Sequence, residues 1–270
     1  MTNLLFIADV IGSPGREVVR GLLPELRRRH DLHLVICNCE NSAAGYGVTR
    51  DTARDLFEAG CDVLTGGNHL WDKKDAIDYL GEEPRLVRPA NLPAGTPGQG
   101  WRVFKASNGA PVAVVNLIGR VFMKEADSPF EAADRVLEQL KSQAKIVVVD
   151  VHAEASAEKV AMGWHLDGRA SLVVGTHTHV QTADNRVLPK GTAYLTDAGM
   201  TGPHDGVIGV EKEPVIGKFL SGLRARFETA TGDPRLNGAI VTADPSTGLA
   251  TAIERVSLSA DDIERLVAGA

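Results

Sequence analysis

The sequence predicts an α/β fold, in which buried strands alternate with helices along the chain. Short apolar runs of strand length are separated by segments with helical periodicity over most of the chain before residue 180. The 270 residues suffice for a sizeable core, and 43% hydrophobic and 24% charged residues are ordinary for a globular protein. We therefore expect one domain that spans residues 1–270.

The alternation begins at the first residues of the chain. Residues 4–10 form a continuous apolar strand, and Ser13 as an N-cap followed by Pro14 predicts the start of a helix that runs to about Arg29. The same pattern predicts the other elements of this part of the chain. They are strands at 32–39, 62–67, 86–90, 101–107, 111–119, 145–152 and 171–177, and helices at 49–58, 73–80, 129–142 and 155–163.

The C-terminal third of the sequence has a different pattern. Turn residues at 189–191 and 244–248 predict two hairpins. Between them, segment 201–235 contains a glycine-rich loop, a short helix near 214–223 and a turn at 231–234. We expect this segment to be an extra surface element, with a mobile cap as the alternative.

Charge and cysteine content exclude several classes of protein. The net charge of −6 argues against binding a nucleic-acid duplex by bulk charge, and no apolar run reaches the roughly 18 residues of a membrane span. Three cysteines are too few for a disulfide framework, and we expect Cys37 and Cys39 to be small buried side chains. The first residues lack the basic segment of a signal peptide, so we expect a cytoplasmic protein.

Polar groups that can bind a metal follow five of the predicted strands. They are Asp9; Glu40 and Asn41; Asn68 and His69; His152; and His177 and His179. The carboxyl ends of strands in such a fold are where ligands bind. Carboxylate, amide and imidazole ligands without a thiolate suit manganese, iron, zinc or cobalt. The set is too large for one ion, so we expect two ions that share Glu40, about 3.5–4 Å apart.

The charge of such a site also points to its substrate. Two divalent ions, the carboxylates of Asp9 and Glu40 and a bridging hydroxide leave a net charge of roughly +1. The site could therefore attract a phosphoryl group that the acidic surface would repel. Metal binding lowers the pKa of water from about 15.7 toward about 7, so the bridging hydroxide is a nucleophile for in-line attack on phosphorus.

The order of these residues resembles the calcineurin-type metallophosphoesterases, whose pattern is D-x-H, GD, GNH(E/D), H and GHxH. GGNHLWD (66–72) and GTHTH (175–179) match it well. Two features depart from it: Ile11 stands where the first histidine would fall, and the bridging acid is Glu40, followed by Asn41. Asn41 is a candidate to replace the missing histidine.

These departures are themselves similar to a bacterial subgroup, the YmdB-type phosphodiesterases. The similarity extends to ADVIGSPGR (8–16), CENSAAGYG (39–47) and MTGPHDGVIG (200–209), and it covers essentially the whole chain. The resemblance implies a four-layer α-β-β-α sandwich of the metallophosphoesterase type. It also implies phosphodiesterase activity on small diesters such as 2',3'-cyclic nucleotides, iron or manganese ahead of zinc, cobalt or magnesium, and a homo-oligomer.

The resemblance implies a role for each candidate residue. One metal ion would be held by Asp9, Glu40, Asn41 and His179, and the other by Glu40, Asn68, His152 and His177. His69 would face the substrate, where it could stabilise developing charge or protonate the leaving oxygen; a structural role is its alternative. His204, in the glycine-rich loop, is a further candidate for substrate contact.

Other functions compete with this hypothesis. A phosphomonoesterase would use the same metal ligands on a substrate with more negative charge. A regulatory protein that binds a phosphorylated ligand with little turnover would need the metals but not His69 as an acid. A dinucleotide-dependent oxidoreductase is disfavoured, because DVIGSPGR (9–16) lacks G-x-G-x-x-G.

Overall fold

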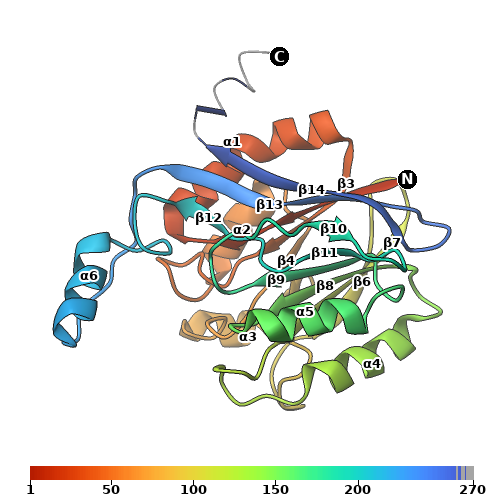
Figure 1. Cartoon of the computed structure of the whole chain (residues 1–270), viewed down its shortest axis with the longest axis horizontal. Coiled ribbons are helices and arrows are strands. Elements are labelled where there is room, and N and C mark those ends of the chain that lie inside the picture. Colours follow the sequence, from red (N-terminus) through yellow and green to blue (C-terminus); the bar gives the residue numbers. More distant parts are fainter. Residues whose placement is uncertain (260, 263–264, 266–270) are drawn as a thin grey trace.

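The computed structural model describes residues 1–259, 261–262 and 265, and two stacked β-sheets form its centre (Figure 1). The strands of the first sheet are β1 (Thr2–Ile7), β2 (Asp9–Val10), β3 (Leu32–Asn38), β4 (Val63–Thr65), β5 (Leu86–Val87), β12 (Met200–Pro203), β13 (Pro234–Ala243) and β14 (Ala250–Ser259). Their order is β2-β12-β13-β1-β3-β4-β5, and β14 also pairs with β13. Strands β1, β3, β4 and β5 run parallel, so their carboxyl ends lie at one edge.

The second sheet has the order β10-β11-β9-β8-β7-β6. Its strands are β6 (Trp101–Lys105), β7 (Pro111–Ile118), β8 (Ile146–His152), β9 (Leu172–Thr176), β10 (Arg186–Val187) and β11 (Ala193–Leu195). Strands β7, β8, β9 and β11 run parallel, whereas β6 and β10 pair antiparallel at the two edges.

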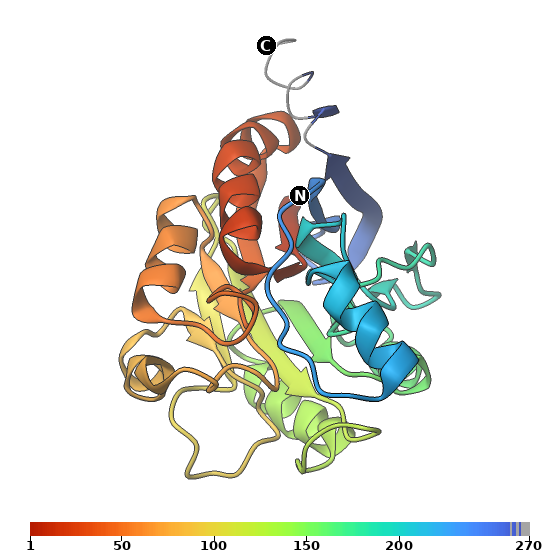
Figure 2. The ribbon, with the colours of Figure 1, turned by 90° about the vertical axis from the view of Figure 1, so that its left-hand side faces the viewer.

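Helices cover the outer faces of both sheets. They are α1 (Gly12–His30), α2 (Arg50–Glu58), α3 (Lys74–Glu82), α4 (Pro129–Leu140) and α5 (Ser156–His165), and α6 (Lys212–Ser221) is a further helix. Buried side chains of α1, α2 and α3 pack on the first sheet, and those of α4 and α5 pack on the second. Helix α6 projects from the body of the protein (Figures 1 and 2).

The alternation of side chains along each strand explains why the strands read as continuous apolar runs. In β1, Leu5 and Ile7 face the helices, whereas Leu4 and Phe6 belong to the core between the sheets. A strand that is buried on both faces needs apolar residues at every position. The predicted four-layer α-β-β-α sandwich is therefore confirmed.

Most predicted elements are present with shifted ends. Thr49 caps α2 by accepting a hydrogen bond from the backbone N–H of Thr52. The predicted cap at Ser13 is wrong: α1 begins at Gly12, and the preceding Ile11 makes no side-chain cap hydrogen bond. Pro14 still lies in the first turn, where its missing N–H has no helical partner to lose.

The two predicted hairpins are also present, at the β10–β11 and β13–β14 connections. Segment 201–235 contains α6 and most of β12. Its role as a cap or a surface insertion stays a prediction, as does the single domain over 1–270, whose last residues lie partly outside the described chain.

Two further expectations concern cysteines and membranes. Cys37, Cys39 and Cys61 are buried and free, as expected for small core side chains. Among the described residues, no helix is both long and apolar enough to cross a membrane.

Candidate metal centre

The predicted metal ligands lie at the edge of the sandwich where parallel strands of both sheets end. The first sheet supplies Asp9, Glu40, Asn41 and Asn68, and the second supplies His152, His177 and His179. Contacts of 4.0 Å or less connect all of them. The fold therefore joins residues that are as distant in sequence as Asp9 and His177.

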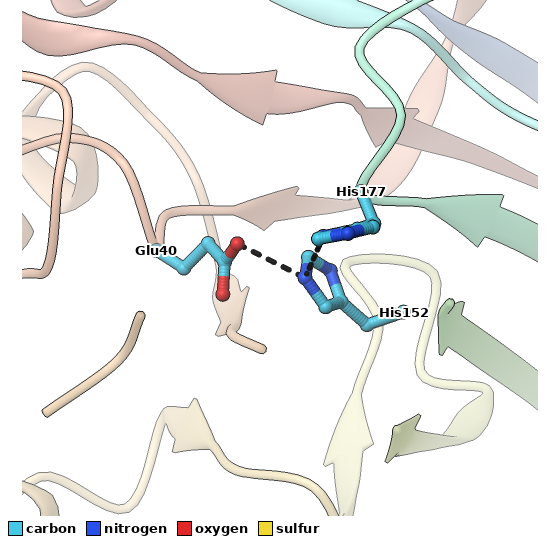
Figure 3. A group of neighbouring side chains, drawn as sticks. All are labelled: Glu40, His152 and His177. Atoms are coloured by element: carbon cyan, nitrogen blue, oxygen red, sulfur yellow. Dashed lines mark hydrogen bonds and ion pairs between the residues drawn. The ribbon is translucent and has the colours of Figure 1, made fainter. Parts of the chain in front are cut away.

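One half of this cluster surrounds Nε2 of His152 (Figure 3). That nitrogen lies 2.9 Å from Oδ1 of Asn68, 3.0 Å from Oε1 of Glu40 and 3.1 Å from Nδ1 of His177. Gly67 permits this convergence, because a Cβ atom there would lie 2.3 Å from Oε2 of Glu40 and 2.4 Å from Nε2 of His152. Potential ligand atoms of Glu40, His152 and His177 all lie within 4.8 Å of one another, so these residues could hold a metal ion.

The other half of the cluster surrounds Nε2 of His179. This nitrogen lies 3.2 Å from the amide nitrogen of Asn41 and 4.0 Å from Oδ1 of Asp9. Oδ2 of Asp9 accepts a hydrogen bond of 3.2 Å from the backbone N–H of His177, which joins the two halves. Rotation of the Asn41 amide by half a turn would direct its oxygen toward the same point.

Hydrogen bonds outside the cluster determine which nitrogen of His152 can bind a cation. Thr176 donates its hydroxyl proton to Asp150, at 2.7 Å, so the same hydroxyl must accept from Nδ1 of His152, at 2.9 Å. The proton on Nδ1 leaves the lone pair of a neutral ring on Nε2, facing Glu40. Outer partners of this kind orient histidine ligands in metal sites.

The other two imidazoles follow the same rule. Nε2 of His177 lies 3.1 Å from a carboxylate oxygen of Glu154, and Nδ1 of His179 donates to the carbonyl of Ile208 at 3.0 Å. Burial lowers the pKa of His177 to about 3 and also lowers the pKa of His179, so both rings are neutral. Each ring therefore has its proton on the nitrogen that faces an outer partner and its lone pair directed into the cluster.

Buried charge makes the cluster attractive to cations. Burial raises the pKa of Asp9 well above its ordinary value of 3.8, and the negative charge of Glu40 raises it further. Burial also opposes the charged form of His152, but the neighbouring carboxylates of Glu40 and Asp9 outweigh it and raise the pKa of His152 to about 9. The positive charge of His152 in turn lowers the pKa of Glu40 to about 2, against the effect of burial. In the absence of another cation, the carboxylates of Asp9 and Glu40 thus keep His152 protonated.

Unsatisfied atoms show that a metal ion fits this cluster. Oδ1 of Asp9 and Oε1 of Glu40 are buried without a hydrogen-bond partner, and the short contact of Glu40 with His152 lacks hydrogen-bond geometry. Buried carboxylate oxygens without partners are costly unless a cation neutralises them. Mixed carboxylate, amide and imidazole donors suit divalent ions of intermediate softness.

His69 lies beside the cluster and lines a cavity over the ligands. Its backbone N–H donates to Oε2 of Glu40 at 3.1 Å, and its Nδ1 lies 2.7 Å from a carboxylate oxygen of Asp72. The ring also makes an edge contact with Tyr46, at 5.4 Å between centroids. Asp72 fixes the ring through Nδ1, which leaves Nε2 free to meet a substrate.

A cavity of about 420 Å³ opens over the ligands, with His69, His177 and His179 in its wall. Its lining also includes apolar side chains from α6 and the segment after it, among them Val215, Phe219 and Phe227, together with Lys218. The ammonium group of Lys218 lies 5.2 Å from the ring centroid of Phe227. The site therefore combines a polar floor with an apolar, partly aromatic wall, as is usual for small-molecule sites.

His204 is a predicted site residue that belongs neither to the ligand cluster nor to the wall of this cavity. It borders a neighbouring hollow of about 380 Å³, and its Nδ1 donates to the carbonyl of Gly202 at 3.0 Å. Its predicted contact with substrate stays a prediction.

Several residues around the cluster were not predicted from the sequence. The spacing of Asp150 and His152 places them on one face of β8, a signal that could have identified Asp150 as a partner of the histidine. Glu154 and Phe227 have no comparable signal, because each lies in a loop, and the helix that carries Lys218 has no sequence feature that links it to the ligands.

Comparison with known proteins places this geometry in context. The family model described as "YmdB-like protein" matches residues 5–256. The chain is 49% identical over 259 residues to a Bacillus subtilis (strain 168) protein named 2',3'-cyclic-nucleotide 2'-phosphodiesterase, covering 96% of this chain and 98% of that protein.

Two solved structures have the same fold. A hypothetical protein from Thermus thermophilus is 44% identical with a TM-score of 0.89, over 96% of this chain and 99% of that chain. A protein from Mycoplasma pneumoniae described as a novel phosphatase is 34% identical with a TM-score of 0.90, over 99% of this chain and 96% of that chain.

Proposed function

The chain belongs to the YmdB-like family, and on this premise we propose that it is a metal-dependent phosphodiesterase that hydrolyses 2',3'-cyclic nucleotides. The family match confirms the resemblance predicted from the motifs. The observation that carries the proposal is the convergence of three imidazole rings on two buried carboxylates with unsatisfied oxygens. The substrate class follows from the name of the Bacillus subtilis relative.

The proposal assigns the ligands to two divalent ions that share Glu40. Asn68, His152 and His177 complete one set, and Asp9, Asn41 and His179 complete the other. Manganese and iron are the ions we expect, ahead of zinc, cobalt or magnesium. When bound, such ions lower the pKa of a coordinated water toward neutrality and polarise the phosphoryl oxygens.

The chain's own residues would then position and protonate the substrate. His69, held through Nδ1 by Asp72, would present Nε2 to the phosphoryl group, where it could donate a proton to the departing sugar oxygen. The apolar wall that includes Phe219 and Phe227 would exclude water from one side of the cavity and contact the organic part of the ester. A proton donor is useful here because an alkoxide is a poor leaving group.

A substitution experiment with a chromogenic diester tests the proposal. The protein loaded with Mn²⁺ should hydrolyse bis-p-nitrophenyl phosphate and 2',3'-cyclic AMP, and Asp9→Ala should abolish both activities. Rates for the wild-type protein no higher than those of Asp9→Ala would count against an enzymatic role. Binding of a cyclic nucleotide without turnover would instead favour the regulatory alternative.

Phosphomonoesterase activity is the second candidate, favoured by the description of the Mycoplasma pneumoniae structure as a phosphatase. A monoester carries up to two negative charges on phosphorus, whereas a diester carries one. Rates on mono- and bis-p-nitrophenyl phosphate, compared at equal metal loading, distinguish the two activities.

The proposed partner is thus a small phosphate ester and not a nucleic-acid duplex, in keeping with the acidic chain. The cytoplasmic location and the homo-oligomer stay predictions.

A further inference from the structure

The segment that carries two of the proposed ligands has strained backbone. His177 has φ of 97° and His179 has φ of 63°, which lie in the left-handed region that side chains other than glycine seldom adopt. Such residues persist only where surrounding contacts hold them. The residue between them, Thr178, is the place where those contacts are made.

The carboxylate of Asp197 accepts two hydrogen bonds from Thr178. One of its carboxylate oxygens, Oδ2, accepts from the backbone N–H of Thr178 at 3.2 Å and from its hydroxyl at 2.7 Å. The other oxygen accepts from the backbone N–H of Gly199 at 2.8 Å, which ties the carboxylate to its own turn. Asp197 is 1% exposed, so water does not compete for these bonds.

Lys159, on α5, is the second residue that contacts this segment, and it also pairs with Asp197. Its ammonium group lies 2.5 Å from Oδ2 of Asp197 and donates to the carbonyl of Thr176 at 2.9 Å. Lys159 is also 1% exposed. Gly175 gives its stem room, because a Cβ atom there would lie 2.5 Å from Cδ of Lys159. Lys159 and Asp197 therefore form hydrogen bonds with the residues on both sides of His177, which are Thr176 and Thr178.

A buried ion pair is a poor means of stabilising a fold. The desolvation of two charges offsets most of their attraction, and apolar replacements are often equally stable. Such a pair is better suited to imposing one geometry, since its hydrogen bonds have fixed directions and its loss leaves a buried charge. Here the geometry concerned is that of the two histidines.

We propose that Lys159 and Asp197 are positioning residues that hold His177 and His179 in the geometry required for metal binding. This inference rests on the proposed metal centre and adds residues that are neither ligands nor in contact with the cavity. It predicts that the pair controls the affinity for metal separately from the stability of the fold.

The test uses Lys159→Met, Asp197→Asn and the double variant. Each single variant leaves an imperfectly paired polar group in the interior, so both should melt at a lower temperature than the wild type. The double variant removes both charges and should recover much of the lost melting temperature. Its Kd for Mn²⁺, measured by calorimetry, should nevertheless remain weaker by about 10- to 100-fold, the range seen when outer partners of ligands are removed.

A gentler variant and a remote control accompany this set. Thr178→Val removes the hydroxyl that donates to Asp197 and keeps the branched shape, so Mn²⁺ affinity should fall roughly tenfold with little change in melting temperature. Arg27→Met breaks a different ion pair, with Asp62 at the opposite end of β4, and should lower stability while leaving Mn²⁺ affinity unchanged.

The outcomes separate this inference from the proposed function. A double variant that regains both stability and wild-type Mn²⁺ affinity, or a Thr178→Val variant with unchanged affinity, overturns the positioning role and leaves the metal centre standing. A wild-type protein that binds no Mn²⁺, Fe²⁺ or Zn²⁺ overturns the metal centre itself.

Discussion

Replacing Asp9 by asparagine should stabilise the metal-free protein while weakening its binding of metal. The carboxylate is fully buried, and its Oδ1 has no hydrogen-bond partner. Burial raises its pKa, so the folded state binds a proton more tightly than the unfolded state does. Stability of the metal-free protein therefore falls as pH rises above the ordinary value of 3.8, and at pH 7 the folded chain carries that penalty. Asparagine removes the charge and keeps the shape.

The expected size of the effect follows from the burial. A buried polar group without a partner costs about 1–3 kcal/mol. With a central value of about 2 kcal/mol and a shift of roughly 2–4 °C per kcal/mol for a chain of this size, the melting temperature in EDTA should rise by about 4–8 °C.

Thermal unfolding with and without Mn²⁺ measures both halves of the prediction. A metal present at about 100 times its Kd stabilises the wild type by about 2.7 kcal/mol, and the Asp9→Asn variant should gain much less. The control is Asp31→Asn, at a carboxylate whose side chain is 87% exposed, which should behave as the wild type does. A variant that is less stable than the wild type in EDTA, yet gains as much from Mn²⁺, would refute the assignment of Asp9.

Three further predictions concern protons, turnover and substrate choice. Because the carboxylates raise the pKa of His152 from 6.5 to about 9, its charged form stabilises the metal-free fold below pH 6.5, and this contribution should fade, with the melting temperature, as pH rises toward 9. Mn²⁺ binding at pH 7.5 should displace the proton of His152, so calorimetry in buffers of different ionisation enthalpy should detect about one proton released per chain. Binding of Mn²⁺ without proton release would contradict this prediction. His69→Ala should lower kcat by about 10²- to 10⁴-fold without changing Mn²⁺ affinity, and a parallel loss of metal would make His69 structural. Phe227→Ala should raise KM for 2',3'-cyclic AMP about tenfold but not for glycerol 1,2-cyclic phosphate, which lacks a base, since stacking on a base contributes about 1–3 kcal/mol. Phe122→Ala, at a ring that is 89% exposed and does not line the cavity, is the matched control, and equal effects on both substrates would exclude a base contact.

The α/β fold and the convergence of the polar residues could be predicted from the sequence because both depend on strand patterns. Continuous apolar runs such as Leu4 to Ile7 indicate strands buried on two faces, and parallel strands bring their carboxyl ends to one edge. The polar residues after strands of one sheet therefore lie near one another, and the stacking of the two sheets brings Asp9 close to His177. The resemblance to a known family then supplied the layer order and the role of each ligand.

The supporting contacts could not be predicted, because they depend on tertiary structure alone. Lys159 lies in a helix where a lysine ordinarily faces solvent, and only the packing of α5 on β9 buries it against Asp197. The left-handed backbone at His177 has no sequence signal either, since residues other than glycine adopt it only in a few per cent of cases. Likewise, the sequence of the glycine-rich loop does not indicate that His204 borders the neighbouring hollow and not the cavity over the ligands.

Hydrolysis of 2',3'-cyclic AMP by protein stripped with EDTA and then reloaded tests the central claim most directly. Chromatography of the products should show 3'-AMP after Mn²⁺ or Fe²⁺ is restored and no product before, with about two ions per chain by elemental analysis. Unchanged substrate with every divalent ion, or equal turnover in EDTA, would contradict the account.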